Sequence, residues 1–313
     1  MTETLRPMFP HVIDSTMLSA FRSCPIKMKY SYIEHWKPKL ESVHLHAGAA
    51  FAKGLEETRK AFYIDGKDAS TSEGLGLQAL LIAYGDFIPI TNTPKTLDRV
   101  AGAFEYFMSM YPLGADGFEP AKLPSGNRGI EFSFAEPLDI LHPVTGDPIL
   151  FAGRADMMGT YAGGFFIEDD KTTTSLGASW ARAWEMRSQF TAYCWAAKKA
   201  GYNPQGALIR GVSILKTKYD TLEVVTYRGQ WELDRWEAQT LRDIQRMIDS
   251  WESGIWDYSL DQACTDYGGC SFVDTCKSRY PENHLETDFE KRVWSPTDRR
   301  EFTVAEWEAS WEN

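Results

Sequence analysis

Asp156, Asp169 and Lys171 are the residues of this 313-residue chain whose types and spacing most directly suggest chemistry. Asp156 stands within one apolar run, and Asp169 and Lys171 stand at the end of the next, at a spacing that suggests a shared role. Two ionised carboxylates about 4 Å apart repel each other by roughly 4 kcal/mol at an effective dielectric near 20. A hard divalent cation such as Mg²⁺ or Mn²⁺ removes that repulsion, because it prefers carboxylate oxygens. A nearby lysine can then orient, or help to deprotonate, a metal-bound water.

The two apolar runs are expected to form β-strands joined by a tight turn. They are residues 148–158 and 164–171. A turn at Ala162–Gly163 places Asp156 opposite Asp169, whereas a turn at Gly163–Gly164 places it opposite Lys171. Side chains alternate between the faces of a strand, so either register puts the three charged groups on one face. The alternative is a surface hairpin with scattered charges.

The next element, residues 178–200, is predicted to be a helix that ends at Gly201. Gln189 and Tyr193 stand four residues apart and share one face of this helix, with Arg182 two turns earlier on the same face. A glutamine, a tyrosine and an arginine in line can contact phosphates. A half-buried amphipathic helix whose polar tips meet water is the alternative.

The order of strand aspartate, D-x-K and Q-x-x-x-Y resembles the nuclease core of the PD-(D/E)XK superfamily. More narrowly it resembles the RecB-like exonucleases and the iron–sulfur nucleases of CRISPR adaptation, because Q-x-x-x-Y is specific to that branch. The resemblance implies a DNA nuclease with a restriction-endonuclease-like mixed β-sheet flanked by helices. Asp156 and Asp169 would bind metal and Lys171 would be catalytic. Gln189 and Tyr193 would shape the site and hold the DNA strand.

The resemblance extends from about residue 13 to residue 277 and departs from the family pattern on an early helix. Family members often carry G-x-x-x-H there, and the histidine joins the metal, but position 52 of this chain is alanine. Glu56, one turn beyond Ala52, can substitute for the histidine or face solvent, and facing solvent is the ordinary expectation. Glu131, in GIEFSF, either matches a glutamate that such nucleases place beside the metal or is an ordinary strand charge. Asp170 completes the candidate metal ligands.

Four cysteines at the two ends of the chain form a second candidate site. Cys24 stands in FRSCPIK, while Cys264, Cys270 and Cys276 follow a C-x5-C-x5-C spacing. Thiolates in such an arrangement can hold a [4Fe–4S] cluster or a zinc ion. The resemblance favours a structural cluster, because iron–sulfur nucleases of this kind join an N-terminal Cys-Pro segment to a C-terminal cysteine trio, although their first gap is commonly two residues. Cys194, inside the predicted helix, is expected to be a buried apolar residue.

Composition restricts the class of protein. Hydrophobic residues make up 43% of the chain and aromatic residues 13%, which suffices for a sizeable core. The net charge of −11 argues against passive coating of nucleic acid but permits a locally basic groove. No apolar run has the length of a transmembrane helix, and the first residues lack the features of a signal peptide. We therefore expect a cytoplasmic protein without membrane contact, and reduced cysteines.

Three regions are expected along the chain. A mainly helical N-terminal region at 1–125 packs on a nuclease core at 126–260, and a cysteine-rich segment with an acidic tail follows at 261–313. Further helices are expected near 13–34, 47–63, 93–111 and 230–252, and further strands near 130–134, 207–216 and 222–227. In the tail, Trp307 and Trp311 stand at helical spacing, which suits a packed terminal helix or a docking site for a partner.

The residues and the resemblance together predict a metal-dependent DNA exonuclease or end-processing nuclease. Its expected substrates are single strands or DNA ends, and a recombination or replication protein would fit as its partner in a phage or bacterial setting. Basic residues interleaved with aromatic ones suit a single strand through phosphate contact and stacking. They are Lys27, Lys29, Lys37 and Lys39, with Tyr30, Tyr32 and Trp36. The alternatives are an inactive DNA-binding or assembly subunit, which the missing histidine supports, and an enzyme that acts on RNA.

Overall fold

The structure is a computed structural model that describes residues 8–89, 92–265 and 269–309. Contacts between Cα atoms divide the chain into two compact units that alternate along the sequence. The first unit comprises 1–40, 133–153 and 234–313, and the second comprises 41–132 and 154–233. Two long strands, β4 (Ile130–Leu141) and β5 (Pro148–Tyr161), contribute residues to both units.

The second unit is built on a mixed sheet. Its strands are the C-terminal part of β5, β3 (Phe118–Pro120), β6 (Gly164–Thr173), β7 (Gly206–Ile214) and β8 (Tyr219–Tyr227). β5 pairs antiparallel with β3 and β6, β6 pairs parallel with β7, and β7 pairs antiparallel with β8. Every residue of β7 is buried, as expected for a central strand covered on both faces. The predicted mixed sheet flanked by helices is therefore confirmed.

The β5–β6 hairpin decides between the two registers that the sequence allows. Its turn is Ala162–Gly163, whose φ angles of 47° and 81° are those of a tight type I′ turn. At the other end of this antiparallel ladder Met157 pairs with Glu168. One further step in the same register sets Asp156 opposite Asp169, so the first of the two predicted registers is correct.

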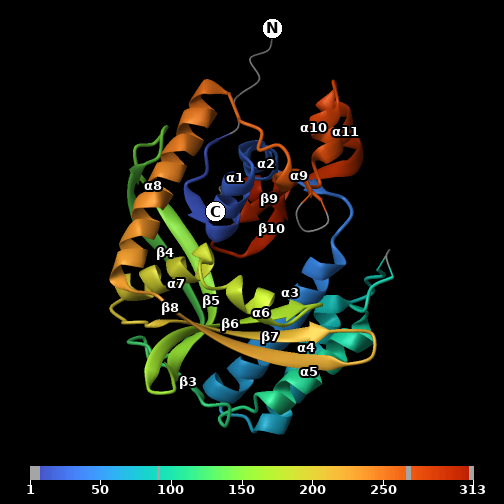
Figure 1. Ribbon diagram of the computed structural model, residues 1–313, viewed down its shortest axis with the longest axis vertical. Helices are drawn as coiled ribbons and strands as arrows, with labels where there is room; N and C mark the ends of the chain where they lie inside the picture. Colours follow the sequence, from blue (N-terminus) through green and yellow to red (C-terminus); the bar gives the residue numbers. More distant parts are fainter. Residues whose placement is uncertain (1–7, 90–91, 266–268, 310–313) are drawn as a thin grey trace. The chain divides into compact units, whose positions relative to one another are not determined.

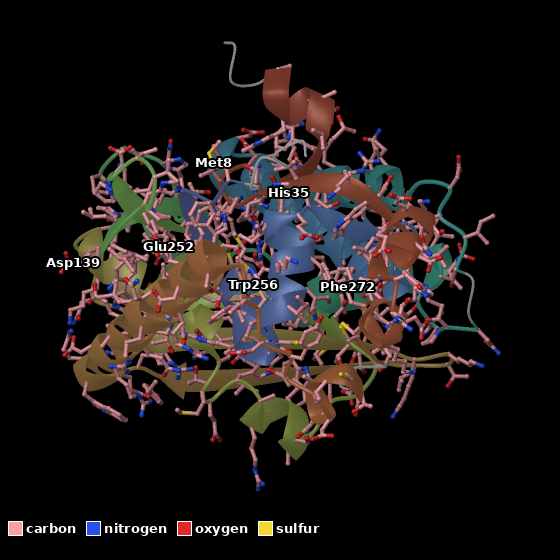
Figure 2. The ribbon with its side chains drawn as sticks, turned by 90° about the horizontal axis from the view of Figure 1, so that it is seen from above. Met8, His35, Asp139, Glu252, Trp256 and Phe272 are labelled. Atoms are coloured by element: carbon pink, nitrogen blue, oxygen red, sulfur yellow. The ribbon has the colours of Figure 1, made fainter. Side chains whose placement is uncertain are left out.

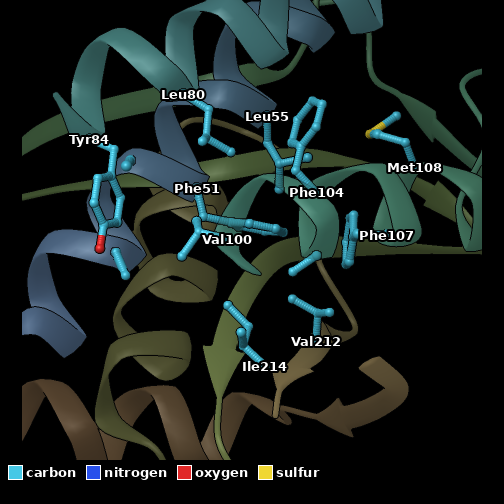
Figure 3. Packing of buried hydrophobic residues seen from close by; sticks show 13 residues of the cluster. Phe51, Leu55, Leu80, Tyr84, Val100, Phe104, Phe107, Met108, Val212 and Ile214 are labelled. Carbon is cyan, nitrogen blue, oxygen red and sulfur yellow. The ribbon is translucent and has the colours of Figure 1, made fainter. Parts of the chain in front are cut away.

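Three helices pack against one face of this sheet. They are α3 (Val43–Arg59), α4 (Ala69–Tyr84) and α5 (Leu97–Met110), and a π-helical turn, η2 (Lys60–Ile64), continues α3. Their apolar side chains form one buried cluster with Val212 and Ile214 of β7 (Figure 3). Within it Phe51 contacts Phe104 and Phe107 edge to face, with ring centroids 6.3 and 5.6 Å apart. This cluster fixes α3 against the sheet.

Helix α4 was not predicted from the sequence. Its apolar residues are spread around the helix and it contains two glycines, so no amphipathic pattern marks it. Gly76 is required for packing: an added Cβ would lie 1.7 Å from the hydroxyl of Thr58 and 2.6 Å from the carbonyl oxygen of Gly54. Only glycine allows α3 and α4 to approach so closely. Helix α5 also begins later than predicted, at Leu97.

The single helix predicted over 178–200 is two helices, α6 (Ala178–Arg182) and α7 (Ser188–Lys199). The chain is extended at Arg187, directly before α7, and Gly201 adopts a positive φ of 88° just after it. Trp180 of α6 covers Gly211 of β7, where a Cβ would lie 2.4 Å from the indole ring. Helices α6 and α7 thus lie on the sheet face opposite α3, α4 and α5 (Figure 1).

The first unit begins with β1 (Val12–Asp14), which runs parallel to Leu150–Ala152 of β5. Asp14 then caps α1 (Ser15–Ser23), because its carboxylate accepts hydrogen bonds from the N–H groups of Thr16 and Met17. The same carboxylate accepts a 2.9 Å hydrogen bond from the indole N–H of Trp294. Helix α2 (Pro25–Met28) and the π-helical turn η1 (Lys29–Ile33) follow. The predicted helix at 13–34 is therefore interrupted at the proline.

The C-terminal half of the first unit contains α8 (Gln230–Ser253) and a small antiparallel sheet of β2 (Trp36–Pro38), β9 (Phe289–Ser295) and β10 (Arg300–Thr303). Short helices α9 (Gln262–Thr265), α10 (Val273–Lys277), α11 (Pro281–Asp288) and α12 (Val304–Ala309) complete it. Trp307 packs on Phe302, and with Met8 and His35 it lines an apolar cavity of about 620 Å³ (Figure 2). Trp311 lies outside the described residues. Among the described helices, none is long and apolar enough to cross a membrane.

Candidate functional site

The three charged residues of the β5–β6 hairpin lie together in the second unit. The Lys171 ammonium pairs with the Asp169 carboxylate, and the N–H of Asp170 donates to Oδ2 of Asp156 over 3.0 Å. Burial raises the pKa of Asp169 above its usual range, and the negative charge of Asp156 adds to the shift while Lys171 opposes it. Burial disfavours the charged form of Lys171, but Asp169 and Asp156 outweigh burial and hold its pKa above the ordinary value.

Helix α7 adds the glutamine and the tyrosine. Nε2 of Gln189 donates to Oδ1 of Asp169 over 3.4 Å and to the hydroxyl of Tyr193 over 2.9 Å. Gln189 therefore reaches the acidic pair directly, and Tyr193 is connected to it through Gln189. Arg182 is exposed on α6, beyond the break at 183–187, so it does not continue their line along one helix face.

Glu131 lies near the start of β4 and pairs with Nε of Arg154 over 2.7 Å. Its φ of 52° is in the left-handed region, where a residue with a side chain is strained. Burial, followed by the charge of Asp156, raises the pKa of Glu131 to about 7. Glu131 thus belongs electrostatically to the carboxylate cluster. No sequence pattern points to Arg154, which stands two residues before the strand aspartate.

Asp170 faces the other side of β6, because side chains alternate along the strand. Nη2 of Arg59, on α3, lies 2.6 Å from Oδ2 of Asp170 and 3.2 Å from Oε1 of Glu168. The two adjacent aspartates of β6 therefore serve opposite faces: Asp169 meets α7 and Asp170 meets α3. Nothing in the sequence marked Arg59 as their partner.

Glu56 does not face solvent, contrary to the ordinary expectation. It is 8% exposed and pairs with the ammonium groups of Lys53, at 3.1 Å, and Lys60. Burial alone would raise the pKa of Glu56, but Lys60 and Lys53 lower it. Its negative charge contributes to the raised pKa of Glu131, which places it at the edge of the carboxylate cluster. Ala52, at the position of the family histidine, is exposed.

The donor chemistry of this cluster fits a hard divalent cation. Glu131, Asp156 and Asp169 supply only carboxylate oxygens, and their charges act on one another in a desolvated place. A cation would neutralise this charge, which Arg154 and Lys171 now balance in part. Across the described parts of the chain, no three His, Cys, Asp or Glu side chains form a set that could hold a metal ion.

The four predicted cysteines meet in the first unit. Cys24, Cys264, Cys270 and Cys276 line one small cavity of about 30 Å³, together with Phe272, labelled in Figure 2. All four are free thiols. Burial raises the pKa of Cys276 to about 11, and the other three cysteines add to the shift. The N–H of Ser259 donates to Sγ of Cys24 over 3.3 Å. Cys194 is buried on α7, as predicted.

Three of the four lysines predicted to follow a DNA strand have partners within the protein. Lys29 pairs with Glu34 at 3.1 Å, and Lys37 pairs with Glu301. Lys39 donates to two carbonyl oxygens at the end of α11, at 3.1 and 2.6 Å. The contacts of Lys37 and Lys39 connect β2 and the residue after it to β10 and α11 within the first unit.

Acidic residues and a lysine occupy adjacent strands of the mixed sheet, and α7 adds a glutamine that contacts one of them. This arrangement is typical of a nuclease. The family model of the PD-(D/E)XK nuclease superfamily matches residues 15–277, and the chain belongs to that superfamily. No curated protein sequence matches the chain.

Two solved structures are similar to the chain at low sequence identity. One is a candidate exonuclease from Eubacterium rectale, with 14% identity, a TM-score of 0.45, and 81% of this chain and 87% of that chain covered. The other is the protein SSO0001, with 14% identity, a TM-score of 0.28, and 75% and 84% covered. The family assignment depends on the family model alone.

Proposed function

We propose that the chain is a metal-dependent DNA exonuclease or end-processing nuclease of the RecB-like branch, with a structural iron–sulfur cluster. The observation that carries the proposal is the hydrogen bond from Gln189 to Asp169, because it connects the Q-x-x-x-Y element with the D-x-K element. Two motifs more than a dozen residues apart meet where the carboxylates are buried. We further propose a cytoplasmic role in DNA recombination or replication, with a protein of that machinery as partner.

The side chains divide the work of phosphodiester hydrolysis. Mg²⁺ or Mn²⁺ held by Asp156 and Asp169, with Glu131 beside them, would lower the pKa of a bound water and stabilise charge that develops on the phosphate. Lys171 stays protonated beside Asp169 and is placed to orient the attacking water. Gln189 orients the Asp169 carboxylate, and the Tyr193 hydroxyl holds the Gln189 amide in turn.

Asp170 and Glu56, the two remaining candidate ligands, have cationic partners of their own. Asp170 pairs with Arg59, and Glu56 pairs with Lys53 and Lys60. We therefore assign them to the surroundings of the metal, where they add negative charge without replacing Asp156 and Asp169 as ligands.

The segment between β6 and α7 is our candidate for contact with the DNA strand. It connects Lys171 to Gln189 and carries Arg182 and Arg187, both exposed. Guanidinium groups suit phosphates because their donors form a planar fork. Their place beside the proposed catalytic groups favours a single strand or a frayed end as substrate.

We assign a [4Fe–4S] cluster to the thiol cavity, because four cysteine sulfurs hold such clusters in other proteins. Cys24, Cys264, Cys270 and Cys276 supply that set, and the Ser259 N–H donates to one of the sulfurs. The cluster would join the N-terminal helices of the first unit to its C-terminal segment. Zinc on the same thiols is the alternative occupant.

Incubation with end-labelled DNA tests the nuclease directly. Wild-type protein and Asp169→Asn are compared on single-stranded DNA, duplex DNA and RNA of the same sequence, with Mn²⁺ and with EDTA. We expect Mn²⁺-dependent release of label from DNA by the wild type alone. Cleavage that persists in EDTA, or in Asp169→Asn, would overturn the assignment of this site. Faster cleavage of RNA than of DNA would identify RNA as the substrate.

One observation favours a second candidate function. The exposed Ala52, where family members place a histidine on the metal, suits a DNA-binding or assembly subunit that retains the fold without the activity. Under that function the protein would shift labelled DNA in a gel, and no divalent metal would produce cleavage.

A further inference from the structure

Strands β5 and β6 separate at the proposed site. Their antiparallel ladder ends at Met157 and Glu168, whereas the parallel ladder of β6 with β7 continues to Thr173. Two residues beyond Glu168, the main-chain N–H of Asp170 donates to the Asp156 carboxylate over 3.0 Å. The orientation of Asp156 therefore depends on where the Asp170 peptide is held.

Arg59 contacts this part of β6 from the opposite face. It bridges Asp170, at 2.6 Å, and Glu168, at 3.2 Å, through the same Nη2. The three side chains are 7%, 2% and 0% exposed, so water does not screen the contacts. A guanidinium is planar and presents its donors in a rigid fork, which suits it to fix two carboxylates relative to each other.

The helix that carries Arg59 is itself fixed. Arg59 is the last residue of α3, and Phe51 and Leu55 of the same helix belong to the buried cluster of Figure 3. That cluster contains Val212 and Ile214 of β7, the strand that pairs with β6. The position of Arg59 is therefore determined by the packed core.

We propose that Arg59 is a positioning residue of the site: through Asp170 it holds the N–H that orients the Asp156 carboxylate, and it thereby sets the affinity for the divalent cation. The proposal deepens the proposed function and rests on it for the identity of the metal ligands. It requires metal binding only, so it is tested separately from cleavage.

The test is Mn²⁺ titration by calorimetry, with the half-activating Mn²⁺ concentration for DNA cleavage as a second readout. Arg59→Met should weaken Mn²⁺ binding about 10- to 100-fold, the range found when partners of metal ligands are removed. Because this variant also leaves two buried carboxylates without their partner, the variant Arg59→Met/Glu168→Gln/Asp170→Asn is measured beside it. The triple variant removes the unbalanced charge but retains the Asp170 main-chain N–H.

If Arg59 acts through position, the triple variant regains thermal stability and still binds Mn²⁺ at least about 10-fold more weakly than the wild type. Wild-type affinity in the triple variant would overturn the proposal, because charge balance alone would then explain Arg59. The matched control is Arg210→Met. Arg210 is 1% exposed and pairs with Asp116 at 2.5 Å and Glu223 at 3.0 Å, and its Nη1 lies 3.9 Å from Oε1 of Glu168.

Arg210→Met should lower stability with little change in Mn²⁺ affinity, and an equal loss of affinity would contradict a specific role for Arg59. Wild-type protein that binds Mn²⁺ but cleaves no nucleic acid would refute the proposed function, while the binding comparison still decides the role of Arg59. Wild-type protein that binds no Mn²⁺ would overturn the role of Arg59.

Discussion

The carboxylate site of the second unit and the thiol site of the first unit are built in opposite ways. In the carboxylate site three acidic groups face cations of the protein: Asp169 faces Lys171, Glu131 faces Arg154 and Asp170 faces Arg59. Asp156 accepts a hydrogen bond from the main-chain N–H of Asp170. In the thiol site four sulfurs share one cavity of about 30 Å³, and the charge of each cysteine disfavours the ionisation of Cys276.

This difference indicates what each site needs from a bound metal. Buried ion pairs keep the carboxylates in place without metal, because removing one partner of such a pair is costly. Among the described residues that line the thiol cavity, Lys27 is the one cation for four thiols. An occupant that binds thiolates would therefore supply most of the stabilisation and couple binding to folding. Mutations in the carboxylate site should therefore affect activity, whereas mutations in the thiol site should affect the fold.

The largest effect is expected at the hairpin. Asp156→Ala, Asp169→Ala and Lys171→Ala should each lower the rate of metal-dependent DNA cleavage by about 10³-fold or more, and double variants should lose little further, because the groups act as a unit. The melting temperature of Lys171→Ala should fall less than that of the cysteine variants, since only one pair is lost, although the buried Asp169 carboxylate is left without its cation. Rates on end-labelled DNA and thermal unfolding measure the two effects. Full activity of Lys171→Ala would exclude this hairpin as the catalytic site.

The thiol site should show the reverse pattern. Replacement of Cys24, Cys264, Cys270 or Cys276 by alanine should remove a large share of the roughly 10 kcal/mol that structural metal binding can supply to folding. Protein purified without oxygen should be brown, with broad absorbance near about 400 nm that these variants lose, as expected for thiolate-bound iron. Urea unfolding and metal analysis measure both.

Cys194→Ala is the control for the thiol variants. Cys194 is buried on α7 of the second unit and does not line the thiol cavity of the first unit, so its replacement should leave the colour unchanged. About four irons per chain support the cluster, and one zinc supports the alternative. Freshly prepared anaerobic protein that contains neither metal would show that the thiols do not form a metal site.

The hairpin was the most predictable part of the site. Alternation along two strands and a two-residue turn sufficed to place Asp156, Asp169 and Lys171 together, and only the choice of register required the structure. The Q-x-x-x-Y element was predictable from i, i+4 spacing on one helix turn. These inferences succeeded because the sequence separations are short and the local geometry is regular.

The rest of the site depends on contacts between distant segments. Arg59 stands 111 residues before Asp170, as their numbers show, and no spacing rule connects them. Glu56 was expected in solvent because its burial depends on how α3 packs, although its partners Lys53 and Lys60 are near it in the sequence. Helix α4 has no amphipathic face that periodicity could reveal. Its Gly76 is required by the close approach to Gly54, which is a contact between helices and leaves no sequence pattern. The break between α6 and α7 has no proline or glycine to mark it.

A smaller effect is expected on α7. Gln189→Ala removes the donor to Asp169 and should lower cleavage about 10- to 100-fold, as loss of a ligand's hydrogen-bonding partner commonly does. Tyr193→Phe removes only the hydroxyl that accepts from Gln189, so its effect should be several-fold smaller. Steady-state rates at saturating Mn²⁺ measure both. If Tyr193→Phe proved the more damaging change, the tyrosine would contact substrate directly and not through Gln189.

The smallest effect is expected for a buried ammonium group that donates to a neutral hydroxyl. Lys95, also in the second unit, is 2% exposed, and its ammonium donates to the neutral hydroxyl of Thr172 over 3.2 Å. Burial lowers the pKa of Lys95 from the ordinary 10.5 to about 8. The folded protein therefore holds this proton less tightly than the unfolded chain does. The group destabilises the fold below pH 8, and this cost disappears as the pH rises from about 8 to about 10.5.

Lys95→Met should accordingly stabilise the protein by about 1–2 kcal/mol at pH 7, and the advantage over wild type should shrink by pH 10. Urea unfolding of both proteins at the two pH values measures the difference. Lys53→Met is the control, because Lys53 pairs with Glu56 and Glu57, and its loss should not stabilise the fold. If Lys95→Met destabilised the protein at pH 7, the buried ammonium would have to be balanced by an acidic partner. Lys95 would then resemble Asp169, Glu131 and Asp170, each of which forms an ion pair with a group of opposite charge.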